Sequence, residues 1–120
     1  MKTKLAFLSL FSITALLGGA VCAADSGAKL NVLVVTGGHG FQREPFFKMF
    51  ADNRSITFTE AKQTKTSEAY ERDDLAGFDV VVLYDMVQNI TDAQKAKFLS
   101  LFDKGIGLVV LHHALVLARI

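Results

Sequence analysis

Histidine side chains at two expected strand ends are the features of this 120-residue sequence best suited to chemistry. His39 follows an apolar run that ends at Thr36, and His112 and His113 follow a second apolar run that begins at Ile106. An imidazole can bind a metal, or give and take a proton near neutral pH. Both runs are typical of parallel strands buried on two faces, and functional groups gather beyond the carboxyl ends of such strands. We therefore expect the histidines to share one edge of a sheet, with His39 and His113 as catalytic residues.

The glycine-rich turn around His39 is a candidate binding loop. Gly37, Gly38 and Gly40 would let backbone N–H groups approach a ligand, and the start of a following helix would favour an anion there. The alternative is a tight turn whose glycines are needed only for positive φ. The turn is not a Walker loop, and it is not a dinucleotide fingerprint because Arg43 stands where that motif needs Gly or Ala.

A divalent metal such as zinc is the cofactor that the histidines suggest, with His39 and His113 as ligands. Adjacent strand residues point to opposite faces, so only one of His112 and His113 would face the crevice, and His112 is kept as a binding residue. Catalytic zinc needs a third protein ligand. Asp85, after another apolar run, is a candidate for that position or for ligand binding, and the alternative is an ordinary turn carboxylate.

Other classes of function find less support in the composition. The sequence has no G-x-S-x-G motif, and its single cysteine, Cys22, lies in the expected leader, so a thiol or elbow-serine mechanism lacks its first component. Thirteen Lys and Arg face 12 Asp and Glu, and two of the basic residues lie in the same leader. The basic residues do not cluster into a stripe that could follow a phosphate backbone, so we expect no nucleic-acid partner.

The first 23 residues have the three parts of a secretory signal peptide: a basic start, a short apolar run and small residues before the cut. Cleavage is expected between Ala23 and Ala24, which predicts a secreted or periplasmic protein without a stable membrane span. The apolar run, 5–17, is shorter than the ~20 residues that a spanning helix needs. A membrane anchor is thus one alternative to cleavage, and lipid attachment at Cys22 is another. A lipid-attachment site prefers Gly or Ala directly before its cysteine, and here that residue is Val21.

Apolar patterning predicts the elements that position these residues. Strands are expected at 29–36, 55–60, 78–84 and 106–112, and helices at 42–52 and 91–104, with a helical turn at 67–71 inside a polar connection. Thr91 and Gln94 form a capping-box pattern, and Gly105 supplies a helix stop. This rhythm predicts an α/β fold with a flavodoxin-like parallel sheet flanked by helices.

The segments 33–39, 78–85 and 105–115 resemble the ThuA-like (trehalose-utilisation) family in residues, order and spacing. The resemblance implies a class I glutamine amidotransferase-like fold and a link to carbohydrate metabolism, with trehalose or a keto-sugar as the substrate class. It places His39, His112 and His113 in the pocket, around a metal. Histidine stands where true amidotransferases carry their cysteine, so that activity is not implied. An active member would be a metal-assisted sugar hydrolase or isomerase.

ThuA-like domains continue well past the His-His-Ala segment, so the resemblance implies a partial domain at 30–120, joined to the signal peptide by a linker at 24–29. An uncovered sheet edge in such a piece would favour self-association. Two alternatives to a sugar-active protein remain open. One is a non-catalytic binding or interaction module, and the other is an inactive fragment of a longer ThuA-like protein.

Overall fold

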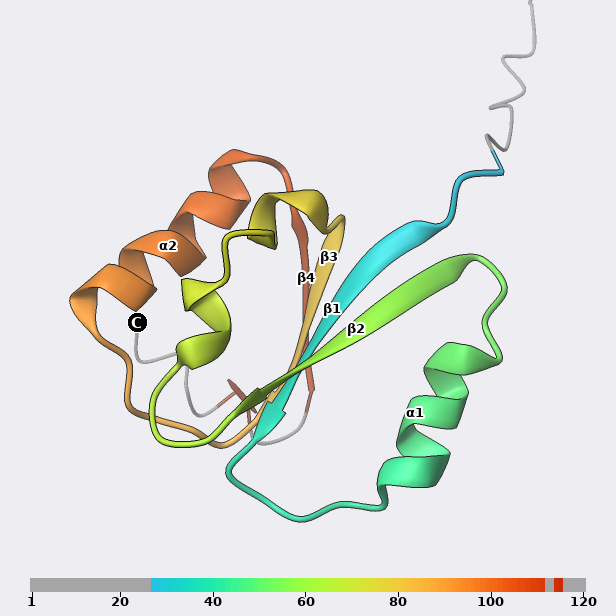
Figure 1. Ribbon diagram of the computed structural model, residues 1–120, viewed down its shortest axis with the longest axis horizontal. Helices are drawn as coiled ribbons and strands as arrows, with labels where there is room; N and C mark the ends of the chain where they lie inside the picture. The colour runs from blue at the N-terminus through green and yellow to red at the C-terminus, as the bar shows by residue number, and fades with distance from the viewer. Residues whose placement is uncertain (1–26, 112–113, 116–120) are drawn as a thin grey trace, which may run out of the picture.

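The computed structural model describes residues 27–111 and 114–115. Within them, four parallel strands form one sheet in the order β2-β1-β3-β4 (Figure 1). The strands are β1 (Leu30–Gly37), β2 (Ile56–Gln63), β3 (Val80–Asp85) and β4 (Gly107–Val110). The expected signal peptide, Cys22, His112 and His113 lie outside the described residues.

Helices cover both faces of the sheet. One face carries α1 (Arg43–Ala51), and the other carries α2 (Asp92–Asp103) with two short 3₁₀ helices, η1 (Glu68–Glu71) and η2 (Leu75–Gly77) (Figure 1). This arrangement confirms the predicted α/β fold, a flavodoxin-like parallel sheet flanked by helices. The strand order reverses between β1 and β3, and this is the place where open α/β sheets bind ligands.

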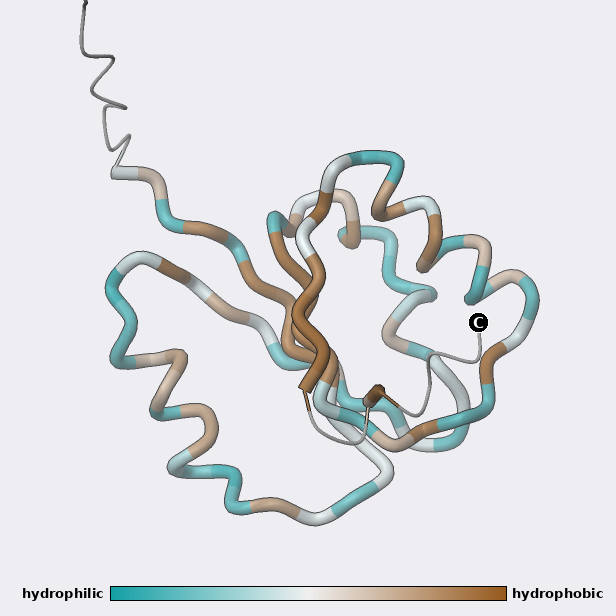
Figure 2. Tube along the Cα trace, turned by 180° about the vertical axis from the view of Figure 1, so that it is seen from behind, coloured by the Kyte–Doolittle hydropathy of each residue, from teal (hydrophilic) through white to brown (hydrophobic). Residues whose placement is uncertain are grey.

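Successive side chains of a strand point to opposite faces of the sheet, so a hydrophobic core forms on each face. The face toward α2 buries Leu33 and Val35 of β1 with Phe98 and Leu101 of α2. The face toward α1 buries Val32 and Val34 with Phe50, and the other phenylalanines of α1 pack around them. Because β1 is buried on both faces, it has the continuous apolar run that marks a central parallel strand (Figure 2).

Two strands end at least two residues from the expected position, and the other strand boundaries differ by one or two residues. β2 continues three residues past Glu60 to Gln63, because every residue of β2 pairs with a residue of β1 up to Gly37. Pairing with β1 therefore outweighs the polar character of Lys62 and Gln63. β4 is shorter than expected and ends at Val110, where its pairing with β3 ends.

The capping box of α2 forms as predicted. The Thr91 hydroxyl accepts a hydrogen bond from the Gln94 backbone N–H, and the Gln94 side chain accepts one from the Thr91 N–H. Thr91→Ala is expected to lower the free energy of unfolding by about 1 kcal/mol. Urea unfolding measures this loss, and Ser100→Ala in the same helix is the control. Equal stability of Thr91→Ala and the wild type would contradict the capping role.

No helix in the described part of the chain has both the length and the apolar character that crossing a membrane requires.

Candidate functional site

The carboxyl ends of three strands meet at one level. Gly37 of β1 pairs with Gln63 of β2 on one side and with Asp85 of β3 on the other. Residues in register on parallel strands point to the same face, so the side chains of Gln63 and Asp85 flank a position without a side chain. Beyond this row the chain turns through Gly38, His39 and Gly40 into α1.

Gly37 and Gly38 are required by the backbone of this turn. Their φ angles are 140° and 75°. A Cβ at Gly37 would lie 2.2 Å from the Gln63 carbonyl oxygen, and one at Gly38 would lie 2.9 Å from the Met86 carbonyl carbon. Gly40 has open space around it and no such φ. The geometry of the turn alone therefore explains two of the three glycines, as the tight-turn alternative predicts.

The turn nevertheless borders a hollow, which we call the glycine pocket. It has a volume of about 220 Å³ and is lined by the segment 36–41 together with Arg43 and Lys62. It lies on the α1 face of the sheet, since Lys62 and Thr36 are in register and alternate with Gln63 and Gly37. The start of α1 is next to it, and the N-cap residue Gln42 makes no side-chain capping bond.

Two cationic side chains of the glycine pocket differ in their partners. Arg43 binds both carboxylate oxygens of Glu60, and the Thr36 hydroxyl donates to the same carboxylate. The Arg43 hydrogen bonds hold the pKa of Glu60 below its ordinary value, with partial burial opposing them. Lys62 is exposed and makes no salt bridge among the described residues. Lys62 is thus the cation best placed to meet a ligand.

His39 is held by backbone and aromatic contacts. Its Nε2 lies 3.2 Å from the Tyr84 carbonyl oxygen and its Nδ1 lies 3.3 Å from that of Gly40. The ring packs edge-on to Tyr84, with centroids 4.7 Å apart, and at a tilt to Phe41 at 5.6 Å. A neutral imidazole has one N–H, so only one of the two nitrogens can donate in that state. Tyr84 belongs to sheet packing, as its stacking on Phe46 shows.

The described residues do not form a metal site by themselves. No group of three His, Cys, Asp or Glu side chains among them is close enough to hold an ion. Both nitrogens of His39 also face carbonyl oxygens, so a metal bond would have to displace one of these contacts. The other expected ligands, His113 and the neighbouring His112, lie outside the described residues, and their assignment stays a prediction.

Asp85 is the last residue of β3 and is completely buried, rather than the turn carboxylate that the alternative suggested. Its Oδ2 accepts a hydrogen bond from Gln63 Nε2 at 2.8 Å. Burial raises the pKa of Asp85 to about 6, against the opposing effects of nearby N–H groups, the Gln63 amide and the charge of His39. Burial and the charge of Asp85 raise the pKa of Tyr70 of η1, and the nearby Gln63 side chain opposes this rise.

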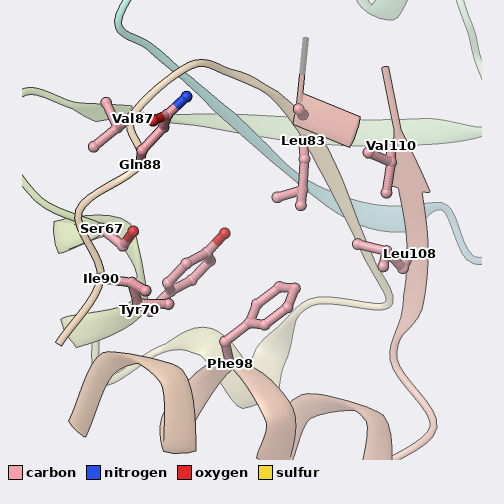
Figure 3. Close-up of a pocket in the computed structure, with 10 residues that line it drawn as sticks. Ser67, Tyr70, Leu83, Val87, Gln88, Ile90, Phe98, Leu108 and Val110 are labelled. Carbon is pink, nitrogen blue, oxygen red and sulfur yellow. The ribbon is translucent and has the colours of Figure 1, made fainter. Parts of the chain in front are cut away.

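An apolar cavity of about 100 Å³ lies on the α2 face of the sheet, and Tyr70 forms part of its wall. Tyr70 and Phe98 project into it from one side, and Leu83 and Val110 from the sheet (Figure 3). The Ser67 hydroxyl at its edge donates to the Asn89 carbonyl oxygen. The carboxyl end of the sheet therefore carries a polar pocket on one face and an apolar cavity on the other.

The structure brings part of the predicted site together. His39, Gly37, Gly38 and Gly40 line the glycine pocket, whereas Asp85 does not. No pattern in the sequence marked Lys62, Arg43, Gln63 or Tyr70 as part of a site. Gln63 and Lys62 could have been found only by extending β2 to the level of Gly37, because two-residue alternation then places them on opposite faces of the sheet.

Comparison of the chain with protein-family models, with curated proteins and with solved structures found no match.

Proposed function

We propose that this protein is an exported, ThuA-like domain that binds a carbohydrate in the glycine pocket. The observation that carries the proposal is the glycine pocket itself, which lies at the carboxyl end of β1 beside the point of strand-order reversal. The resemblance of the segments 33–39, 78–85 and 105–115 to ThuA-like domains supplies the substrate class, trehalose or a keto-sugar. Export rests on the signal-peptide pattern of 1–23.

The lining of the pocket suits such a ligand. The rings of His39 and Phe41 offer apolar surface for the C–H face of a sugar, and Lys62 and the backbone of the turn offer groups for its hydroxyls. Ligand sites commonly combine apolar and aromatic walls with a few polar groups in this way. The volume is below the roughly 300–1,000 Å³ of drug-sized sites, which favours one sugar unit at a time.

Catalysis is a further step, and it would fall to His39 and His113, with a metal as the supplier of an activated water. The described residues alone do not hold such an ion. Sugar binding is therefore the first property to test, and turnover is the second.

Titration calorimetry with trehalose tests the binding proposal. We expect saturable binding that weakens about tenfold in Lys62→Ala, the loss of roughly one charge-assisted hydrogen bond. Lys95→Ala, on α2 and remote from the glycine pocket, is the matched control and should bind like the wild type. Equal weakening in both lysine variants, or no binding of any sugar tested, would count against the glycine pocket as a sugar site.

A second candidate function is an interaction module, and exposed apolar residues on β4 favour it. Leu108 and Val109 are each 42 % exposed, on opposite faces of the last strand of the described sheet. Edge strands of this kind pair with other strands. A second copy of the chain is the partner proposed, and sedimentation measures it: Val109→Lys should shift the chain toward the monomer. A wild type that stays monomeric at all concentrations would remove this candidate.

A further inference from the structure

The apolar cavity on the α2 face has the composition of a site for a small, uncharged molecule. Of its ten lining residues in the described part of the chain, all except Ser67 and Gln88 have an aliphatic or aromatic side chain. None of the ten is an acidic residue, a basic residue or a histidine. A charged ligand would lose its hydration here without gaining an opposite charge, which is costly. The cavity therefore favours a neutral ligand with a mostly apolar surface.

The floor of this cavity is buried and its mouth is exposed. Leu83 and Phe98 are 6 % and 4 % exposed, whereas Ile90 and Leu108, which line the same cavity, are 36 % and 42 % exposed. Tyr70 and Phe98 project from η1 and α2 toward Leu83, which points down from the sheet (Figure 3). A molecule that enters past Ile90 and Leu108 would therefore lose its contact with water at the floor, and burial of its apolar surface would favour binding.

The size and the walls of the cavity fit one aromatic ring. Its volume of about 100 Å³ is comparable to the roughly 150 Å³ of an apolar protein cavity that binds benzene. The rings of Tyr70 and Phe98 lie with their centroids 4.7 Å apart and their planes tilted by 41°. Aromatic rings attract one another in tilted and edge-to-face arrangements, so a bound ring would extend this pair. A sugar is a poor occupant, because most of its hydroxyls would face aliphatic and aromatic walls.

One buried hydroxyl at the edge of the cavity selects for a hydrogen-bond donor on the ligand. Ser67 is 4 % exposed, and its Oγ donates to the Asn89 carbonyl oxygen at 3.1 Å. A hydroxyl has one proton and two lone pairs. Because the proton is used in the bond to Asn89, the Ser67 oxygen can accept a hydrogen bond from a ligand but cannot donate one to it.

We propose that the apolar cavity binds a small phenol, with the ring between Phe98 and Leu83 and the O–H donating to Ser67 Oγ. The ligand class is a single aromatic ring that carries one hydrogen-bond donor. A phenol ionises only near pH 10, so it is neutral at physiological pH, as the lining requires. The cavity lies on the face of the sheet opposite the glycine pocket, so this site is separate from the proposed sugar site.

Titration of the sugar-free chain with phenol, followed by methyl NMR signals, tests the site. We expect saturable shifts of the methyl signals of Leu83 and Val110, which line the cavity, while those of Val32 and Val34 in the core under α1 stay in place. Shifts that do not saturate, or saturable shifts centred on the core under α1, would overturn the proposal. No sugar is present in this experiment, so its outcome does not depend on the proposed function.

Benzene is the matched ligand for the role of Ser67, because it has the ring of phenol without the O–H. The ratio of phenol affinity to benzene affinity should fall about tenfold in Ser67→Ala, the loss of roughly one hydrogen bond. A variant that merely loosens the cavity would weaken both ligands by the same factor and leave the ratio unchanged. An unchanged ratio would therefore contradict the assigned hydrogen bond.

Val110→Phe tests the position of the ring, because the added side chain takes up volume inside the cavity. It should weaken the binding of phenol and of benzene by more than about tenfold. Leu99→Phe adds an aromatic ring at an exposed position of α2 outside the cavity, and this control should bind like the wild type. Undiminished binding in Val110→Phe would contradict the proposal, and if this variant does not fold the Ser67→Ala comparison decides.

Discussion

Gly37→Ala is expected to lower the free energy of unfolding by about 2–5 kcal/mol. The φ of 140° is one that an alanine adopts only under strain, and the added Cβ would meet the Gln63 carbonyl oxygen at 2.2 Å. Neither group can move easily, because both belong to the ladder that joins β1 to β2. Backbone strain of about 1–2 kcal/mol and overpacking of about 1–3 kcal/mol make up the estimate. Urea unfolding followed by circular dichroism measures it.

Gly40→Ala is the matched control for this prediction. It places the same methyl group in the same turn, but in open space and without a positive φ. Its stability should stay within about 0.5 kcal/mol of the wild type. If the two alanine variants were equally stable, the close approach of β2 to the turn would be wrong, and with it the shape of the glycine pocket.

Leu101→Ala is expected to cost about 2–5 kcal/mol, because the side chain is 2 % exposed in the core between α2 and the sheet. The same helix offers a control two residues away. Leu99 is 45 % exposed, so Leu99→Ala should cost less than about 1 kcal/mol. Thermal unfolding of both variants checks the pair. Similar losses in the two would show that α2 does not cover the sheet in the orientation described.

Patterns in the sequence predict the described fold because each element has a local signal. β1 and β3 are continuous apolar runs, and Thr91 with Gln94 marks the start of α2 by residues that bond one another. The end of β2 has no local signal. Its last residues, Ala61 to Gln63, are ordered by pairing with β1, and pairing between distant segments is not encoded in the composition of either one.

The candidate site was predicted only in part for a similar reason. Strand-end position identified His39 and the glycines, since a residue that follows a buried parallel strand must lie at the carboxyl edge of the sheet. Which face each side chain takes depends on register. Asp85 and Lys62 differ in face because Asp85 is level with Gly37 and Lys62 with Thr36. Without the register, the sequence could not show that Asp85 lies on the face opposite the glycine pocket.

Mapping of trehalose binding by amide NMR shifts tests the central claim most directly. If the glycine pocket holds the sugar, saturable shifts should concentrate on the backbone of Gly38, His39, Gly40 and Lys62, while amides of α2 such as that of Lys95 stay in place. Saturable shifts centred on α2 or on β4, with the turn unchanged, would contradict the account.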